Sequence, residues 1–210
     1  MVGQGVLREC LLAPDVGRVL SIVRTPTGRH DVKLQEIVHR DIANLLPIES
    51  ELQGLDACFF CLGVSSVGMT EAEYRRITFD LTTGAAGTLV KNSPQMTFVY
   101  VSGAGTDSTE KGRIMWARVK GATENALLRM PFKAAYMFRP GGIQPMHGER
   151  PKAALVRIIY AVVAPLAPWL TRVAPGYVTT TERMGRAMLN VVRRGAAKRV
   201  LESADINLTA

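Results

Sequence analysis

The most informative segment of the sequence runs from Met96 to Lys120. It reads Met96-Thr-Phe-Val-Tyr-Val-Ser102-Gly-Ala-Gly, passes through a polar loop, and resumes as Met115-Trp-Ala-Arg-Val-Lys120. The β-branched and aromatic run before Ser102 predicts a strand, and the apolar spacing after the loop predicts a helix. Ligands of open α/β sheets bind at the carboxyl ends of strands, so Ser102 is a candidate site residue.

The composition suits one domain of ordinary size. The chain has 210 residues, of which 47% are hydrophobic, and carries a net charge of +8 with a pI near 9.8. The basic residues are scattered and form no block of like charges. We therefore expect no nucleic-acid partner, and a solvated surface that also attracts an anionic cofactor.

The three cysteines are Cys10, Cys58 and Cys61. An odd count in a chain without a secretion signal argues against structural disulfides. Cys58 and Cys61 have CxxC spacing, but they lie in an apolar, strand-like run, where residues three apart point to opposite faces. We expect buried strand thiols and no metal site, because no second pair of ligands completes a zinc centre.

The residues around Ser102 resemble the short-chain dehydrogenase/reductases, which pair a strand-end Ser with Tyr-x-x-x-Lys on the next helix. The resemblance implies that Ser102 and Lys120 are catalytic, and that Lys120 also holds the ribose hydroxyls of a cofactor. Trp116 occupies the Tyr position. An indole N–H is a donor that does not titrate, so it cannot perform the family's general acid–base step. The match supports the fold and nucleotide binding more than the chemistry.

The resemblance covers nearly all of the chain. It is closest to atypical, Rossmann-type members, similar to Tat-interactive-protein-type oxidoreductases and epimerase/dehydratase-like proteins. It implies an α/β fold in which helices flank a parallel sheet. We expect a single domain over residues 1–210, with residues 143–180 as a small substrate-side lobe.

The N-terminus departs from the family pattern, which opens with an apolar strand and then Gly-Ala-Thr-Gly-x-x-Gly. Met1-Val-Gly3 matches only the last positions, and a helical pattern follows at once. We therefore expect the central first strand and the first two glycines to be absent from this chain. A start site assigned inside the loop and a genuinely shortened protein both explain this. Val2 and Gly3 are the expected remnant of the phosphate loop.

The expected cofactor is NADP(H) rather than NAD(H). Arg24 ends the predicted strand Arg18–Arg24, at a place where Arg accommodates a 2′-phosphate and an acid reads the 2′-hydroxyl. No acid follows Arg24 until Asp31. The alternative is a solvent-facing Arg. By resemblance, the other cofactor contacts are Asp41 beside the adenine, the backbone at Leu62, Gly63 and Val64, and Arg139 with Pro140.

Other patterns predict the remaining elements. A long helix with Tyr74, Ile77, Leu81, Ala85 and Leu89 on one stripe follows a capping box at Thr70–Glu73. A second capping box at Thr179–Glu182 precedes an amphipathic helix that Gly195 ends. His147 lies in a loop, as a surface residue or as a substrate contact. Further strands are predicted at Leu34–Val38, Leu55–Gly63, Ala134–Phe138 and Lys198–Leu201, with a final turn at Asp205–Ile206.

The segment from Ala153 to Leu170 is very apolar, but Arg157, Pro165 and Pro168 interrupt it. It is also shorter than the ~20 residues that span a bilayer. We predict a packed helix of the substrate lobe. A peripheral membrane contact and a dimer face are the alternatives.

Two functions remain open. The first is a cytoplasmic NADP(H)-dependent oxidoreductase that acts on a small carbonyl or alcohol, with the proton supplied by Ser102, Lys120, water or His147. The second is a non-catalytic nucleotide-binding or regulatory protein, which Trp116 favours. The sequence identifies neither the substrate nor the oligomeric state.

Overall fold

A four-stranded parallel sheet contains the strand that leads to Ser102. The computed structural model describes residues 1–148 and 176–210, and the strand order of this sheet is β3-β4-β5-β8. Phe98 pairs with Cys58 on one side and with Ala135 on the other. The carboxyl ends of β3, β4 and β5 therefore share one edge of the sheet. The strands are β3 (Ala57–Phe60), β4 (Thr97–Val101), β5 (Ala134–Arg139) and β8 (Val200–Glu202).

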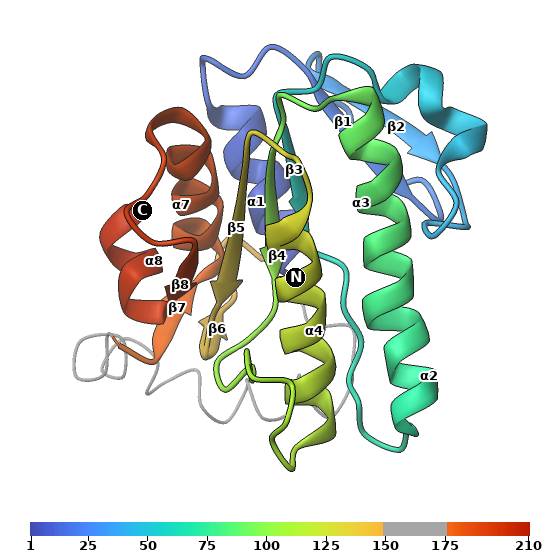
Figure 1. Ribbon diagram of the computed structural model, residues 1–210. Coiled ribbons are helices and arrows are strands. Elements are labelled where there is room, and N and C mark those ends of the chain that lie inside the picture. The colour runs from blue at the N-terminus through green and yellow to red at the C-terminus, as the bar shows by residue number, and fades with distance from the viewer. Residues whose placement is uncertain (149–175) are drawn as a thin grey trace. The chain divides into compact units, whose positions relative to one another are not determined.

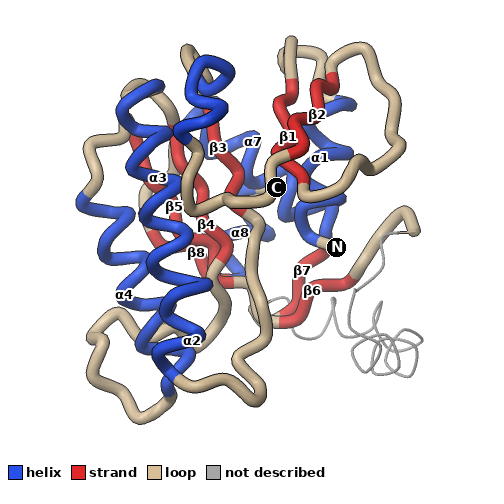
Figure 2. The backbone as a smooth tube through the Cα atoms, turned by 90° about the vertical axis from the view of Figure 1, so that its right-hand side faces the viewer, coloured by secondary structure: helices blue, strands red, loops and turns tan. Residues whose placement is uncertain are grey.

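Asp41–Pro140 and Ala196–Glu202 together form one compact unit, here called the sheet unit. Its helix α3 (Leu81–Asn92) and helix α4 (Met115–Arg129) lie side by side on one face of the sheet (Figures 1 and 2). The unit also contains the 3-10 helix η1 (Leu46–Leu52), the short α2 (Glu71–Arg75) and the π-helical η2 (Arg76–Asp80).

The core of the sheet unit is built on β4. Phe98, Val99 and Tyr100 are at most 1% exposed. The Phe98 ring stacks on Phe60 at 5.9 Å and on Phe132 at 5.0 Å between centroids. Burial on both faces explains the nearly continuous apolar run that the sequence shows here.

The long helix begins as predicted, and it buries Tyr74, Ala85 and Leu89 of the predicted stripe but not Ile77 and Leu81. Thr70 Oγ1 accepts from the backbone N–H of Glu73, and the Glu73 carboxylate accepts from Thr70 N at 2.9 Å, so this capping box is confirmed. Ile77 and Leu81 are only half-buried, and Thr78 and Thr82 take the core positions. The π-helical turn of η2 widens the helix, so from Tyr74 to Thr82 buried residues recur every fourth position instead of alternating by three and four.

A second compact unit contains both chain termini and is here called the terminal unit; it spans Met1–Arg40, Gly141–Gly195 and Ser203–Ala210. Two small parallel sheets belong to it, β1 with β2 and β6 with β7. Its elements are α1 (Val2–Leu12), β1 (Val19–Val23), β2 (Leu34–Val38), β6 (Gly142–Gln144), β7 (Val178–Thr180), α7 (Thr181–Arg194) and α8 (Ser203–Thr209).

Helices α1 and α7 pack closely at Gly185. A Cβ at this position would lie 2.7 Å from Cγ of Glu9 and 3.3 Å from the carbonyl oxygen of Gly5. The missing side chain is therefore what allows the two helices to approach. Glu9 is only 6% exposed at this contact.

The predicted start of α7 is wrong by one residue. The N-cap is Thr180, whose Oγ1 accepts from Arg183 N at 3.0 Å, so Thr179 and Glu182 do not form a capping box. The reason is the pairing of β7 with β6, which keeps Thr180 extended. The predicted end is confirmed, because Gly195 caps the helix with a φ of 74°.

In the described residues, helix α1 precedes the first strand, β1. Within residues 1–148 and 176–210, β1 pairs only with β2, and β3 pairs only with β4. The predicted strands at Leu55–Gly63 and Lys198–Leu201 exist, with the narrower or shifted bounds of β3 and β8.

The segment Ala153–Leu170 lies outside the described residues, as does most of the expected lobe at 143–180. The lobe and its packing therefore stay predictions. Among the described helices, none combines the length and the apolar character that crossing a membrane requires. None of the cysteines forms a disulfide, and burial raises the pKa of Cys58 to about 12. Cys58 lies in β3 as predicted, but Cys61 follows the strand and both residues are only partly buried, so the prediction of two buried strand thiols is wrong for Cys61.

Candidate functional site

Ser102 follows β4 directly and is held by the neighbouring strand. Its backbone N–H donates to the carbonyl oxygen of Phe138 at 2.9 Å, and its Oγ lies 3.2 Å from the same oxygen. Ala104 N donates to the carbonyl oxygen of Pro140 at 2.9 Å. The predicted site residue Ser102 is thus buried and fixed at the carboxyl edge of the sheet.

Lys120 reaches this strand end from α4. Its half-buried side chain donates a hydrogen bond from Nζ to the carbonyl oxygen of Ser102. Burial lowers the pKa of Lys120 to about 8, against an opposing effect of the Glu124 carboxylate. The structure therefore brings together Ser102 and Lys120, the two residues that the sequence paired. The pKa of the Lys120 ammonium lies close to neutral pH.

Glu124 is the residue of this site that the sequence interpretation missed. It lies one helical turn after Lys120 and is 1% exposed. Ser102 Oγ donates to Oε1 at 2.5 Å, and Arg139 Nε donates to the two carboxylate oxygens at 3.0 and 3.1 Å. The i, i+4 spacing from Lys120 was the signal that could have found it.

Arg139 was expected to contact a cofactor. In the structure its guanidinium binds Glu124, Ser108 Oγ at 2.5 Å and Glu202 at 3.5 Å. The hydrogen bonds that Arg139 donates to Glu124 raise the pKa of Arg139. These contacts give Arg139 a clear intramolecular role in holding Glu124, while its contact with a cofactor stays a prediction.

Trp116 stands one turn before Lys120. The position of a Cβ at Gly105 would be 3.5 Å from Cη2 of its indole, so the ring packs on the loop that follows Ser102. Gly105 has a φ of 83°, which favours glycine. The indole forms a wall beside the strand end and offers no titratable atom.

Gly121 fixes the same loop on α4. A Cβ there would lie 1.8 Å from the carbonyl oxygen of Asp107, and Asp107 N donates to Ala117 O at 3.1 Å. The loop therefore lies directly against the helix turn that carries Lys120. These contacts hold the loop that follows Ser102 in one position on α4.

The end of β3 lies along the same edge of the sheet as Ser102. Leu62 and Val64 are 46% and 42% exposed, which is unusual for apolar residues beside a core strand. A Cβ on Gly63 would meet nothing within 4 Å. This exposed apolar edge with an accessible backbone fits the flat, partly apolar rings of a dinucleotide. Asp41 is also exposed, and its carboxylate accepts from Ala43 N at 3.2 Å.

The remaining predicted cofactor residues belong to the terminal unit. Val2 and Gly3 begin α1, whose first turn contains no acidic residue and whose N-cap makes no side-chain hydrogen bond. Such a helix start suits an anion. Arg24 is exposed after β1 and forms no ion pair within the described residues. A shallow hollow of about 410 Å³ nearby in sequence is lined by Arg29, His30, Asp31, Val32 and Leu34.

His147 also lies in the terminal unit, so it does not belong to the compact unit of Ser102 and Lys120. Its Nε2 is 2.7 Å from Glu182 Oε2, and Arg186 binds the other oxygen of that carboxylate at 2.6 Å. The backbone of His147 has a φ of 53°, in the left-handed region. These contacts describe a surface residue tied to α7.

Solved structures of other proteins have a similar fold. The dTDP-glucose 4,6-dehydratase DesIV of Streptomyces venezuelae, solved with NAD bound, superposes with a TM-score of 0.65 at 16% identity, over 99% of this chain and 76% of that one. The fold is Rossmann-like. UDP-glucose 4-epimerase of Thermotoga maritima matches this Rossmann-like chain with a TM-score of 0.61 at 14% identity, over 91% and 70% of the two chains.

Sequence comparison adds a distant relative. Protein fmp52-2, mitochondrial, of Aspergillus oryzae is 26% identical over 214 residues, which span 98% of this chain and 90% of the fungal protein. No protein-family model matches the chain. The structural similarity to epimerases and dehydratases confirms the α/β, Rossmann-like fold that the sequence predicted.

Proposed function

We propose that the protein binds NADP(H) and catalyses oxidation or reduction of a small carbonyl or alcohol substrate. The observation that carries the proposal is Lys120, whose ammonium reaches the carbonyl oxygen of Ser102 at the carboxyl end of β4. Dinucleotides bind at that edge in Rossmann-like folds. The NAD-bound structure of DesIV supports the cofactor class.

The residues of the strand end fit a cofactor that donates or accepts hydride. The exposed Leu62 and Val64 would contact its rings, and Lys120 would donate to ribose hydroxyls. The buried Ser102 and the Trp116 wall would restrict the substrate to one side of the strand end. The exposed Arg24 would bind the 2′-phosphate, which favours NADP(H) over NAD(H).

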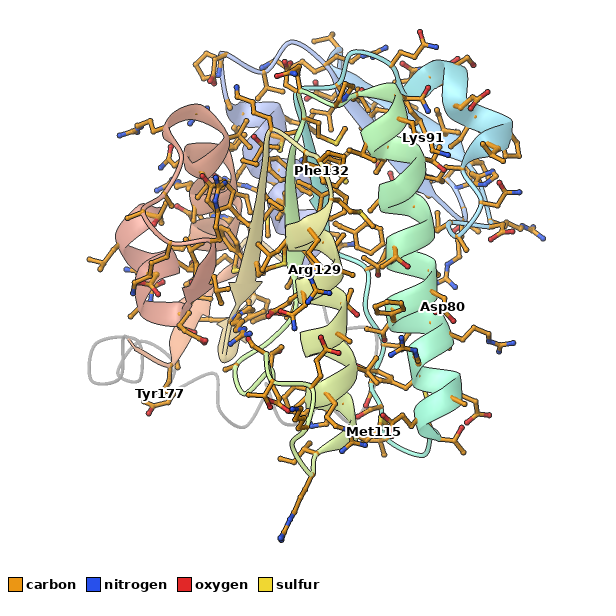
Figure 3. All side chains as sticks on the ribbon, viewed as in Figure 1. Asp80, Lys91, Met115, Arg129, Phe132 and Tyr177 are labelled. Atoms are coloured by element: carbon orange, nitrogen blue, oxygen red, sulfur yellow. The ribbon has the colours of Figure 1, made fainter. Side chains whose placement is uncertain are left out.

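Cofactor binding is the direct test. NADPH and NADH are titrated against the protein by fluorescence, with wild type compared with Lys120→Met and with Lys91→Met as a matched control. Lys91 is exposed at the end of α3, at the opposite end of the helical layer from Met115, where α4 begins (Figure 3). We expect Lys120→Met to weaken NADPH binding about ten-fold or more and Lys91→Met to leave it unchanged. Absence of binding in wild type would contradict the proposal.

A non-catalytic, nucleotide-binding or regulatory role is the second candidate, and Trp116 favours it because an indole does not transfer protons. It predicts NADPH binding without turnover. The cytoplasm remains the proposed location, and the fungal relative, which is named as mitochondrial, makes cell fractionation the appropriate measurement.

A further inference from the structure

Lys120 is the titratable group that the strand end leaves without a counter-ion. Among the described residues it forms no ion pair, and its Nζ donates to a backbone carbonyl. The carboxylate one turn away, Glu124, is bound by the Arg139 guanidinium and by the Ser102 hydroxyl. The charge of Glu124 is therefore largely balanced by Arg139, and the half-buried Lys120 has little compensation for its own charge.

The elements packed around this turn of α4 contribute few other charges. They bring Tyr100 from β4, Tyr74 from α2 and Arg139 from β5, and the pair Arg118–Glu71 lies on the outer side. The loop after Ser102 brings Asp107, whose carboxylate accepts hydrogen bonds from Thr109 and Gly112. Burial raises the pKa values of both tyrosines, so these phenols stay protonated at neutral pH. Of these groups, Glu124 is the one whose charge acts on the pKa of Lys120. Trp116 contributes no proton.

We propose that Lys120 is the proton donor and acceptor of this site, and that the charge of Glu124, which Arg139 holds in place, supports its protonated form. The inference rests on the proposed function and assigns the step that Trp116 cannot perform. A pKa near the operating pH is what general acid–base catalysis favours, and the pKa of about 8 meets that condition.

In the direction of reduction, the hydride comes from bound NADPH, which leaves as NADP⁺. The carbonyl carbon of the substrate gains that hydride, and its oxygen takes a proton from Lys120 Nζ. One N–H bond of the ammonium breaks as the O–H bond of the alcohol forms. The neutral amine then regains a proton from water. In the direction of oxidation, the neutral amine accepts the hydroxyl proton.

The first test measures the ionisation of Lys120 without turnover. The protein is labelled with acetic anhydride over a range of pH, with N-acetyl-lysine amide as internal standard, and the Lys120 peptide is quantified by mass spectrometry. We expect a midpoint near pH 8, and a lower midpoint in Glu124→Gln because a negative charge is removed. A midpoint at the value of the standard would overturn the assignment, while NADPH binding would still support the proposed function.

The second test measures turnover of aromatic and aliphatic dicarbonyl probes with NADPH. In wild type kcat/KM should fall about ten-fold per pH unit above pH 8, because reduction needs the ammonium. Lys120→Met should lose ~10²–10⁴-fold and the pH dependence with it. Lys91→Met should keep both the rate and the break near pH 8.

The outcomes separate the two proposals. Failure of wild type to bind NADPH would reject the proposed function and this inference together. Binding without reduction of any probe would reject the proton-donor role and support the regulatory reading. Unchanged pH dependence in Lys120→Met, in a variant that still binds NADPH, would also reject the role.

Discussion

Glu124 of the sheet unit and Glu9 of the terminal unit are both buried glutamates that arginine side chains bind. Glu124 is bound by Arg139, which is itself only 11% exposed, and it accepts from the Ser102 hydroxyl. Glu9 is bound by Arg8 and Arg186, whose side chains are 28% and 56% exposed. The first carboxylate lies at a strand end, and the second lies at a contact between two helices.

The difference separates a candidate site from a packing contact. Burying both members of an ion pair has a high desolvation cost. A buried ion pair is therefore weak evidence that the pair stabilises the fold. The Glu124 pair carries that cost beside Ser102 and Lys120, at the edge where Rossmann-like folds bind ligands. The Glu9 arginines remain hydrated, and the space next to this glutamate is filled by close approach to Gly185.

The largest expected effect comes from removing the two carboxylates. Glu124→Ala removes the main partner of the largely buried Arg139 and leaves it the longer ion pair with Glu202, so we expect the free energy of unfolding to fall by about 3–5 kcal/mol. Glu9→Ala leaves arginines that can turn to water, and we expect a loss of about 1–2 kcal/mol. Urea denaturation of both variants gives the comparison. Equal losses would mean that the two settings do not differ as described.

The pH dependence of the free energy of unfolding should report on Lys120, which lies one helical turn before Glu124. Its pKa is lowered from the ordinary 10.5 to about 8 in the folded state, so the unfolded chain binds more protons between these values. Stability should therefore rise with pH from about 8 to about 10.5, by at most ~1.4 kcal/mol per unit, and stay level with respect to this group below pH 8.

The measurement is the difference between wild type and Lys120→Met at each pH, which cancels the other titrations. A difference that does not change between pH 8 and 10 would show that burial of Lys120 has little electrostatic consequence. The same pH series in Glu9→Ala serves as the control, because Glu9 belongs to the terminal unit and Lys120 to the sheet unit.

The helix contact at Glu9 is tested by filling Gly185. In Gly185→Ala the new Cβ would lie 2.7 Å from Cγ of Glu9, so α1 and α7 must move apart, and we expect a loss of about 1–3 kcal/mol. Gly87→Ala on α3 is the matched control, because nothing lies within 4 Å of its Cβ. That variant should gain about 0.5–1 kcal/mol from helix propensity. A neutral Gly185→Ala would contradict the close contact.

The smallest effect is expected at Glu182, a partly exposed residue that shares Arg186 with Glu9. Glu182 binds Arg186 and His147, and the hydrogen bond from His147 lowers the pKa of Glu182 from its ordinary 4.5. Glu182→Gln should cost about 0.5 kcal/mol at neutral pH, as partly exposed pairs usually do. The stabilisation is present above pH 4.5 and is lost as pH falls through the lowered value.

Thermal unfolding of Glu182→Gln at pH 7 and pH 3 checks this sign, with Glu49→Gln, an exposed glutamate, as control. The Lys120 labelling midpoint should be the same in Glu182→Gln as in wild type. A shifted midpoint would show that Glu182 and Lys120 are energetically coupled.

The sequence predicted the strand end well because its signals are local. The run of β-formers that stops at Ser102 and the helix that carries Lys120 form one strand–loop–helix unit, and parallel-sheet geometry then places the two residues together. Glu124 was missed because a helical glutamate near Asn125 and Arg129 looks like a solvated residue. Its burial depends on Arg139, which belongs to a different strand.

The errors at the other elements have non-local causes. The cap of α7 moved to Thr180 because β7 pairs with β6, and neither three-residue strand has a sequence pattern of its own. The stripe of the long helix changed at Thr78 because the π-helical turn cannot be read from apolar spacing. The cofactor residues Val2, Gly3 and Arg24 come from resemblance alone, since their role depends on a ligand.

The π-helical turn of η2 has a consequence for comparing sequences by length. A wide turn contains one residue more than an α-helix needs to join the same two ends. A protein of this fold that lacks one residue between Tyr74 and Thr82 would therefore keep the helix and restore ordinary spacing, with Tyr74 and Ala85 still facing inward. A single-residue gap is expected to be tolerated at this place, inside a helix, where alignments usually penalise gaps most.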